Sequence, residues 1–178
     1  KPFNEYLSRI SYILQEAAFV ADVLYYYGDT IPNYGGHKNS RFTSGPGYDY
    51  EIINTEILSG LAVKDGKLII PSTGAQFSIL ALTDEFEINP EVLLKLEKLA
   101  RQGAVIIGAK PKKVTARKIK PGIPEMESLL NKLWTDYNEG GILKKEAKIY
   151  SGIEPSVMLD NLNIPPDLSY PGAELYLL

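Results

Sequence analysis

The 178-residue chain contains no cysteine and a single histidine, His37. The lack of cysteine excludes a disulfide framework, a thiolate metal site and a cysteine nucleophile. The single histidine excludes a metal site that is built from several imidazole ligands. We therefore expect no bound metal.

The chain also lacks the patterns that mark nucleotide, nucleic-acid and membrane binding. Gly28-Asp29-Thr30 does not have the Gly-x-Gly-x-x-Gly spacing that brings a backbone close to a pyrophosphate, so we expect no cofactor. A net charge of -3 gives no reason to expect nucleic acid or an anionic membrane as a partner. The basic segment 110–120 lacks interleaved aromatic residues, which favours a solvated connector. No apolar run approaches the roughly 18 residues of a membrane span.

Apolar runs alternate with helical patterns along the chain, and this alternation predicts an α/β fold. We expect buried strands at 21–27, 77–82 and 104–107, a weak strand at 145–150, a last strand at the C-terminus, and a hairpin at 61–70 around Asp65-Gly66. We expect helices at 3–18, 49–59, 90–102, 124–139 and 155–162. Right-handed crossovers then give a mostly parallel central sheet that is covered on both faces. We predict one domain over residues 1–178, a flavodoxin-like three-layer sandwich.

In such a fold, ligands bind outside the carboxyl ends of the parallel strands. Asp29 follows the strand 21–27 and Asp84 follows the strand 77–82, so we expect the two carboxylates to lie near each other. Glycoside hydrolysis needs two carboxyl groups roughly 5–10 Å apart, one of them with a raised pKa. An aspartate after a strand is also a common helix cap, and we favour this second interpretation for both residues.

Tyr48, Asp49 and Tyr50 form the densest polar and aromatic cluster of the chain. Tyrosine rings that stack on C–H surfaces, beside carboxylates that accept hydroxyl protons, would suit a sugar. The favoured alternative is that Asp49 caps the helix 49–59 and that both tyrosines pack at its entry. His37 lies in the long loop 29–47 and would act as a general base only if that loop folded over a site.

We accordingly predict no catalytic residue, and we predict substrate contacts from one set of side chains. The set is Asp29, His37, Tyr48, Asp49, Tyr50 and Asp84.

Several short motifs, taken in their order along the chain, resemble a segment of the bacterial α-L-rhamnosidase-type glycoside hydrolases, glycoside hydrolase family 106. They are QEAA at 15–18, VLYYYGD at 23–29, PGYDY at 46–50, VKDGKL at 63–68, LARQGAVIIG at 99–108 and PPD at 165–167.

This resemblance implies a domain that follows a catalytic barrel and precedes β-sandwich domains. It implies a class I glutamine amidotransferase-like fold, although the missing cysteine excludes amidotransferase chemistry. It also implies that the catalytic carboxylates lie outside these residues. The implied partners are the barrel and the β-sandwich domains, with carbohydrate as a further candidate. The implied location is periplasmic or extracellular.

Three functions remain open at this point. The favoured one is a non-catalytic accessory domain of a bacterial hydrolase that acts on plant or microbial polysaccharide. Lys1 in place of methionine and the apolar end 174–178 also suggest a piece of a longer protein. Such a domain should expose a contiguous apolar patch when isolated. The second is a free-standing flavodoxin-like module that holds a small ligand at the carboxyl ends of the first and third parallel strands. The third is an autonomous hydrolase that uses Asp29, Asp84 or Glu51.

Overall fold

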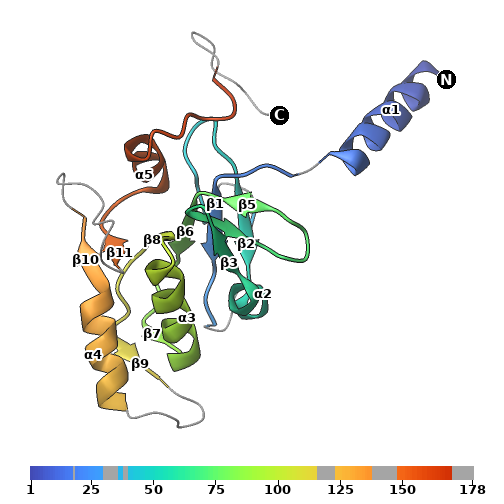
Figure 1. Ribbon diagram of the computed structural model, residues 1–178. Coiled ribbons are helices and arrows are strands. Elements are labelled where there is room, and N and C mark those ends of the chain that lie inside the picture. The colour runs from blue at the N-terminus through green and yellow to red at the C-terminus, as the bar shows by residue number, and fades with distance from the viewer. Residues whose placement is uncertain (18, 30–35, 38–39, 116–122, 138–147, 170–178) are drawn as a thin grey trace.

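The structure is a computed structural model that describes residues 1–17, 19–29, 36–37, 40–115, 123–137 and 148–169 (Figure 1). Its centre is a six-stranded sheet in the order β10-β11-β8-β6-β1-β2, in which every neighbouring pair is parallel. The strands are β1 (Val23–Tyr26), β2 (Tyr50–Ile53), β6 (Ile79–Leu82), β8 (Val105–Ile107), β10 (Trp134–Asp136) and β11 (Ile149–Ser151). The predicted α/β fold with a mostly parallel sheet is confirmed. The narrower flavodoxin-like assignment stays a prediction.

Strand β1 is apolar at every position because both faces of the sheet are covered there. All four of its residues are buried, as expected for an inner strand of a parallel sheet. Leu24 and Tyr26 point into one core, and Val23 and Tyr25 point into the other, following the alternation of a strand.

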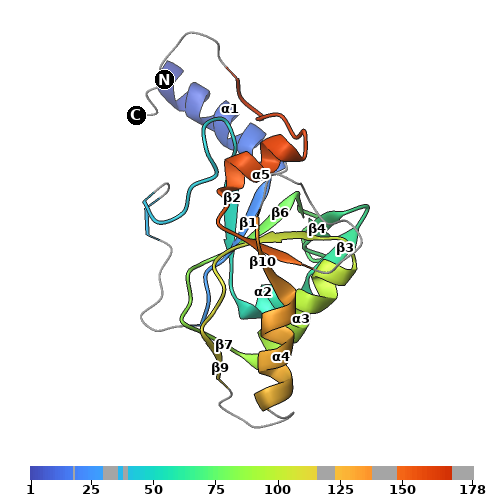
Figure 2. The same ribbon diagram turned by 90° about the vertical axis from the view of Figure 1, so that its left-hand side faces the viewer.

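Helices cover both faces of the sheet, which gives three layers (Figures 1 and 2). The first core contains side chains of α2 (Thr55–Gly60), α3 (Pro90–Arg101) and α4 (Ile123–Leu133). The second core contains Met158 and Leu159 of α5 (Pro155–Asn161) together with Phe42. Asn89 begins α3 as predicted, because its side chain accepts a hydrogen bond from the backbone N–H of Glu91.

The predicted helix 49–59 is wrong in its first half. Residues 50–53 form β2, which pairs with β1, and the helix α2 begins only at Thr55. The N-cap is Asn54, whose Oδ1 accepts from the Ile57 N–H at 3.0 Å, and not Asp49. The isoleucines are spaced as on a helix on both sides of the boundary between β2 and α2, so the spacing predicted a single helix. Residues 50–53 form a strand because they pair with β1.

Two further boundaries differ from the prediction. Helix α4 ends at Leu133, and Trp134 lies in β10, where its indole N–H donates to the Gly108 carbonyl at 3.1 Å. The run 77–82 is divided at Ser78 into β5 (Gln76–Phe77) and β6. The remaining part of the predicted helix after 137 and the C-terminal strand at 174–178 lie outside the described residues.

Two small sheets accompany the central one. The predicted hairpin is confirmed as β3 (Ala62–Lys64) and β4 (Lys67–Ile69), which turn at Asp65 and Gly66 with φ of 54° and 79° and continue to β5. Strands β7 (Glu87–Ile88) and β9 (Lys113–Val114) form a two-stranded parallel ribbon.

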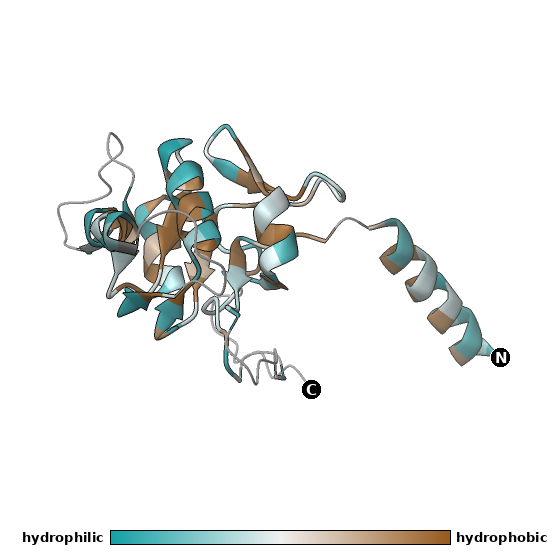
Figure 3. Ribbon diagram, turned by 90° about the horizontal axis from the view of Figure 1, so that it is seen from below, coloured by the Kyte–Doolittle hydropathy of each residue, from teal (hydrophilic) through white to brown (hydrophobic). Residues whose placement is uncertain are grey.

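Helix α1 (Pro2–Glu16) is present as predicted, yet none of its residues is buried. It projects from the rest of the structure, and Figure 3 shows apolar colouring along one side of it. None of the described helices is both long and apolar enough to cross a bilayer.

Candidate functional site

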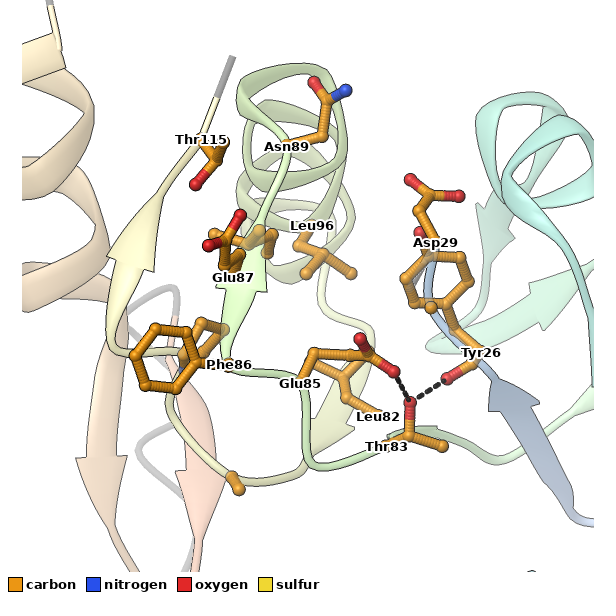
Figure 4. A pocket seen from close by; sticks show the side chains of 14 residues that line it. Tyr26, Asp29, Leu82, Thr83, Glu85, Phe86, Glu87, Asn89, Leu96 and Thr115 are labelled. Carbon is orange, nitrogen blue, oxygen red and sulfur yellow. Dashed lines mark hydrogen bonds between the residues drawn. The ribbon is translucent and has the colours of Figure 1, made fainter. Parts of the chain in front are cut away.

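A cavity of about 630 Å³ opens at the carboxyl ends of β1 and β6, beside the β7–β9 ribbon (Figure 4). Its polar lining includes Asp29, Glu85 and Glu87, with Thr83, Thr115 and Asn89. Leu82, Ile88 and Leu96 contribute apolar surface. The cavity therefore lies where the topology of a parallel sheet favours a ligand.

Gly28 is the residue that allows Glu85 to approach the end of β1. Its φ is +80°, a left-handed conformation that side chains with a Cβ rarely adopt. A Cβ at this position would lie 2.4 Å from the carboxyl carbon of Glu85. Glycine thus allows both this backbone path and the close approach of that carboxylate.

Hydroxyl groups hold two of the three carboxylates in the cavity. Thr83 Oγ1 lies 3.2 Å from Glu85 Oε1 and 3.4 Å from the Tyr26 carbonyl, so its one proton is directed to this pair of acceptors (Figure 4). Thr55 donates its hydroxyl proton to Asp29. The carboxylates of Asp29 and Glu85 are therefore held as hydrogen-bond acceptors.

The phenol of Tyr26 is in turn hydrogen-bonded to the Thr55 hydroxyl. Its oxygen lies 3.0 Å from Thr55 Oγ1. Because the proton of Thr55 is directed to Asp29, the Tyr26 hydroxyl is the donor in this contact. Burial raises the pKa of the Tyr26 phenol far above its ordinary value, so the hydroxyl stays protonated and continues to donate.

The third carboxylate, Glu87, is paired with a cation. Glu87 and Lys113 are direct neighbours in the β7–β9 register, and Lys113 Nζ lies 2.6 Å from Glu87 Oε1. Hydrogen bonds from Lys113 and then from Thr115 lower the pKa of the Glu87 carboxyl. Glu87 is therefore ionised at neutral pH, and it cannot supply a proton there.

Only part of the predicted site lies at this cavity. Asp29 lines it, whereas Asp84 is exposed and is not among the lining residues. His37 is exposed, and most of the loop that precedes it lies outside the described residues.

Tyr48, Asp49 and Tyr50 lie at the opposite, amino edge of the sheet. They precede or begin β2, which runs parallel to β1, whereas Asp29 follows the end of β1. Since 50–53 is a strand and not a helix, the three residues cannot join Asp29 in one site.

The three amino-edge residues have contacts that build the fold. Tyr50 is buried, with its ring 5.7 Å from that of Tyr25. The Tyr48 hydroxyl donates to the Ile164 carbonyl at 2.8 Å. Asp49 Oδ1 accepts from the backbone N–H of Tyr50 at 2.7 Å. Each contact stabilises the entry to β2 or the turn after α5.

Asp22 also lies at this amino edge, at the start of β1. Its carboxylate accepts from the Ser78 hydroxyl at 3.1 Å. Burial raises the pKa of the Asp22 carboxyl, and the charge of Asp167 adds to this effect. The one described carboxyl group with a raised pKa is thus separated from the cavity by the length of the sheet.

Sequence reasoning missed Thr55, Glu85 and Glu87. The available signal was the Thr83-x-Glu85-x-Glu87 spacing directly after an apolar strand, together with Gly28 before Asp29.

Among the residues that the structure describes, no group of three or more histidine, aspartate or glutamate side chains is arranged to hold a metal ion.

The sequence pattern of the family described as alpha-L-rhamnosidase, Glyco_hydro_106, matches residues 1–177. The chain belongs to this family. The expected resemblance to glycoside hydrolases is thereby confirmed.

Two relatives give the scale of the proteins in which such a segment occurs. A protein of Formosa agariphila named "Putative beta-glucuronidase" is 34% identical over 172 residues, which cover 94% of this chain and 14% of that protein. The solved structure of a rhamnosidase from Novosphingobium sp. PP1Y superposes with a TM-score of 0.76 at 25% identity, over 97% of this chain and 17% of that one. The chain therefore spans about one sixth or less of either relative.

Proposed function

We propose that this chain is a non-catalytic accessory domain of a bacterial glycoside hydrolase of the α-L-rhamnosidase type, with an amidotransferase-like α/β fold. The catalytic carboxylates of the longer polypeptide then lie in another domain. The observation that carries the proposal is the state of the three carboxylates in the cavity, each of which is held by a hydrogen-bond donor.

A glycosidase needs one carboxylic acid that keeps its proton near the working pH. Such an acid is typically placed in an apolar pocket that raises its pKa. Here Lys113 lowers the pKa of Glu87, and threonine hydroxyls donate to Asp29 and Glu85. Glu87 is thus held as an anion, while Asp29 and Glu85 are engaged as hydrogen-bond acceptors, and this arrangement supports a role other than general acid for the three side chains.

The share of each relative that the chain covers supports the same proposal. More than four fifths of the glucuronidase-named protein and of the solved rhamnosidase lies outside the matched segment. A separate catalytic domain has ample room there.

The test is hydrolysis of 4-nitrophenyl α-L-rhamnoside by the purified 178-residue chain, with folding verified by near-ultraviolet circular dichroism. We expect no release of nitrophenol above the uncatalysed rate. Turnover that is present in the folded chain and lost in Asp29→Asn would overturn the proposal and favour an autonomous hydrolase.

The cavity favours a second candidate function, binding of a small neutral ligand rich in hydroxyl groups. Its volume of about 630 Å³ is typical of small-molecule pockets, and it combines apolar surface with carboxylate acceptors. Titration of the chain with L-rhamnose, followed by amide chemical shifts, tests this function. Saturable chemical-shift changes around Thr83 that become weaker in the Glu85→Gln variant support it. The control ligand is D-glucuronate, an anion that the carboxylates repel. The absence of saturable shifts refutes it.

A further inference from the structure

Helix α1 has an apolar face without a partner among the described residues. Its large apolar side chains recur at positions that fall on one side of a helix, and all except the half-buried Ile10 are exposed. They are Phe3, Tyr6, Leu7, Ile10, Ile13 and Leu14. Phe3 is 67% exposed and Leu14 is 69% exposed, so these two side chains are largely open to water.

The opposite side of α1 is polar. Asn4, Ser8 and Gln15 lie there, with the aromatic Tyr12 as the exception. Glu5, Arg9 and Glu16 lie beside them, so that the helix carries two negative charges and one positive charge. An amphipathic helix that lies on an anionic membrane is rich in lysine and arginine, and α1 is not. Its composition is that of a surface helix whose apolar side packs on protein.

A helix of this length needs such packing. Isolated helices shorter than about 12–15 residues are marginal in water, and α1 has 15 residues with an uncovered apolar side. The chain that leaves it is also apolar and exposed, since Phe19 is 50% and Val20 is 64% exposed. The uncovered surface therefore continues from α1 into the connection to β1.

Helix α1 belongs to a segment that occurs within much longer proteins. The family pattern begins at residue 1, so α1 belongs to the family segment. The superposition on the solved rhamnosidase covers 97% of the chain, and the remaining 3% is too short to contain the 15 residues of α1. The matched range therefore includes most of α1, in a protein of which the segment is only 17%.

We infer that α1 is a docking helix that packs its apolar face against another domain of the same, longer glycoside hydrolase polypeptide. This inference rests on the proposed function and names the element through which the accessory domain is attached. The contact is apolar at its centre and polar at its rim, where Glu5 and Arg9 remain solvated.

Hydrogen exchange compares α1 in the 178-residue chain and in the longer polypeptide. In the short chain the amides of 6–16 should exchange rapidly, while those of β1 and β6 are protected. In the longer polypeptide the amides of α1 should exchange at least about 100-fold more slowly. Equal exchange rates of α1 in both proteins would overturn the inference.

Two variants of the longer polypeptide separate docking from helix propensity. Leu7→Asp places a charge on the apolar face, and it should restore rapid exchange in α1 without changing the rates in β1 and β6. Ser8→Asp, on the polar face, is the matched control and should leave α1 protected. Equal effects of the two variants would overturn the assignment of the face. If Leu7→Asp prevents folding of the whole protein while Ser8→Asp does not, that result also supports a buried contact.

Measurements on the short chain test two other occupants, a second copy of the chain and an anionic membrane. A concentration-dependent dimer in sedimentation that Leu7→Asp abolishes would assign the face to a second copy. Sedimentation of the chain with anionic phospholipid vesicles would assign it to a membrane. Either result overturns the inference if α1 stays unprotected in the longer polypeptide. The proposed function fails independently, because it is refuted by hydrolysis in the short chain and not by exchange rates.

Discussion

Replacement of Gly28 by alanine tests how the end of β1 is built. Gly28 has a φ of +80°, and an added Cβ would lie 2.4 Å from the carboxyl carbon of Glu85. Alanine in the left-handed region costs about 1–2 kcal/mol. The Glu85 side chain must also move, which weakens its hydrogen bond from Thr83 at a cost of about 1 kcal/mol.

A smaller effect acts in the opposite direction. Alanine restricts the unfolded chain and so stabilises the folded state by about 0.4–1 kcal/mol. The net expectation is a loss of about 2 kcal/mol in the free energy of unfolding. With an m-value of about 2 kcal/mol/M, the midpoint of urea denaturation should fall by about 1 M.

Gly66→Ala is the matched control for this variant. Gly66 has nearly the same φ, +79°, and nothing lies within 4 Å of its added Cβ. It should therefore show the conformational cost alone, about 1 kcal/mol. In a Glu85→Ala background the cost of Gly28→Ala should fall to the same value. If Gly28→Ala is no more destabilising than Gly66→Ala, the role assigned to the Glu85 contact is wrong.

Three further predictions concern charged side chains. Lys95→Met should lower the free energy of unfolding by about 1 kcal/mol, because Lys95 Nζ donates to two carbonyls at the end of α2 at 2.7 and 2.8 Å; an unchanged urea midpoint would contradict this. Asp22→Asn should raise the midpoint at pH 7, since burial raises the Asp22 pKa and the ionised form is disfavoured, and the gain should disappear below the ordinary pKa of 3.8. Glu87→Gln should make the free energy of unfolding fall less steeply in acid. The lowered pKa of Glu87 contributes stability that is fully present above pH 4.5, the ordinary pKa, and is lost as the pH falls through the folded-state pKa. Lys113→Met should have the same effect, because it removes the cation that lowers this pKa.

The parallel sheet could be predicted from the sequence because its strands are short apolar runs separated by helical patterns. The run that became β1 is buried at all four positions, and such a run needs cover on both faces. Asn89-Pro90 and Asp65-Gly66 marked a helix start and a hairpin through local chemistry alone. These features depend on neighbouring residues, and they were correctly predicted for that reason.

The candidate site could not be predicted in the same way. Residues 50–53 fit a helical spacing, and only pairing with β1 makes them a strand, which places Tyr48 and Asp49 at the amino edge. Glu87 is paired with a cation from β9, which lies within a basic segment whose composition favours a solvated connector. Long-range pairing of this kind leaves no local signal.

The most direct test of the non-catalytic assignment is the turnover number of the longer polypeptide when the carboxylates of the cavity are neutralised. Loss of a catalytic carboxylate lowers kcat by about 10²–10⁴-fold. For the Asp29→Asn/Glu85→Gln variant, assayed on 4-nitrophenyl α-L-rhamnoside, we predict a kcat within about threefold of the parent protein. A fall of about 100-fold or more in a variant that remains folded would place the chemistry in this domain and contradict the account.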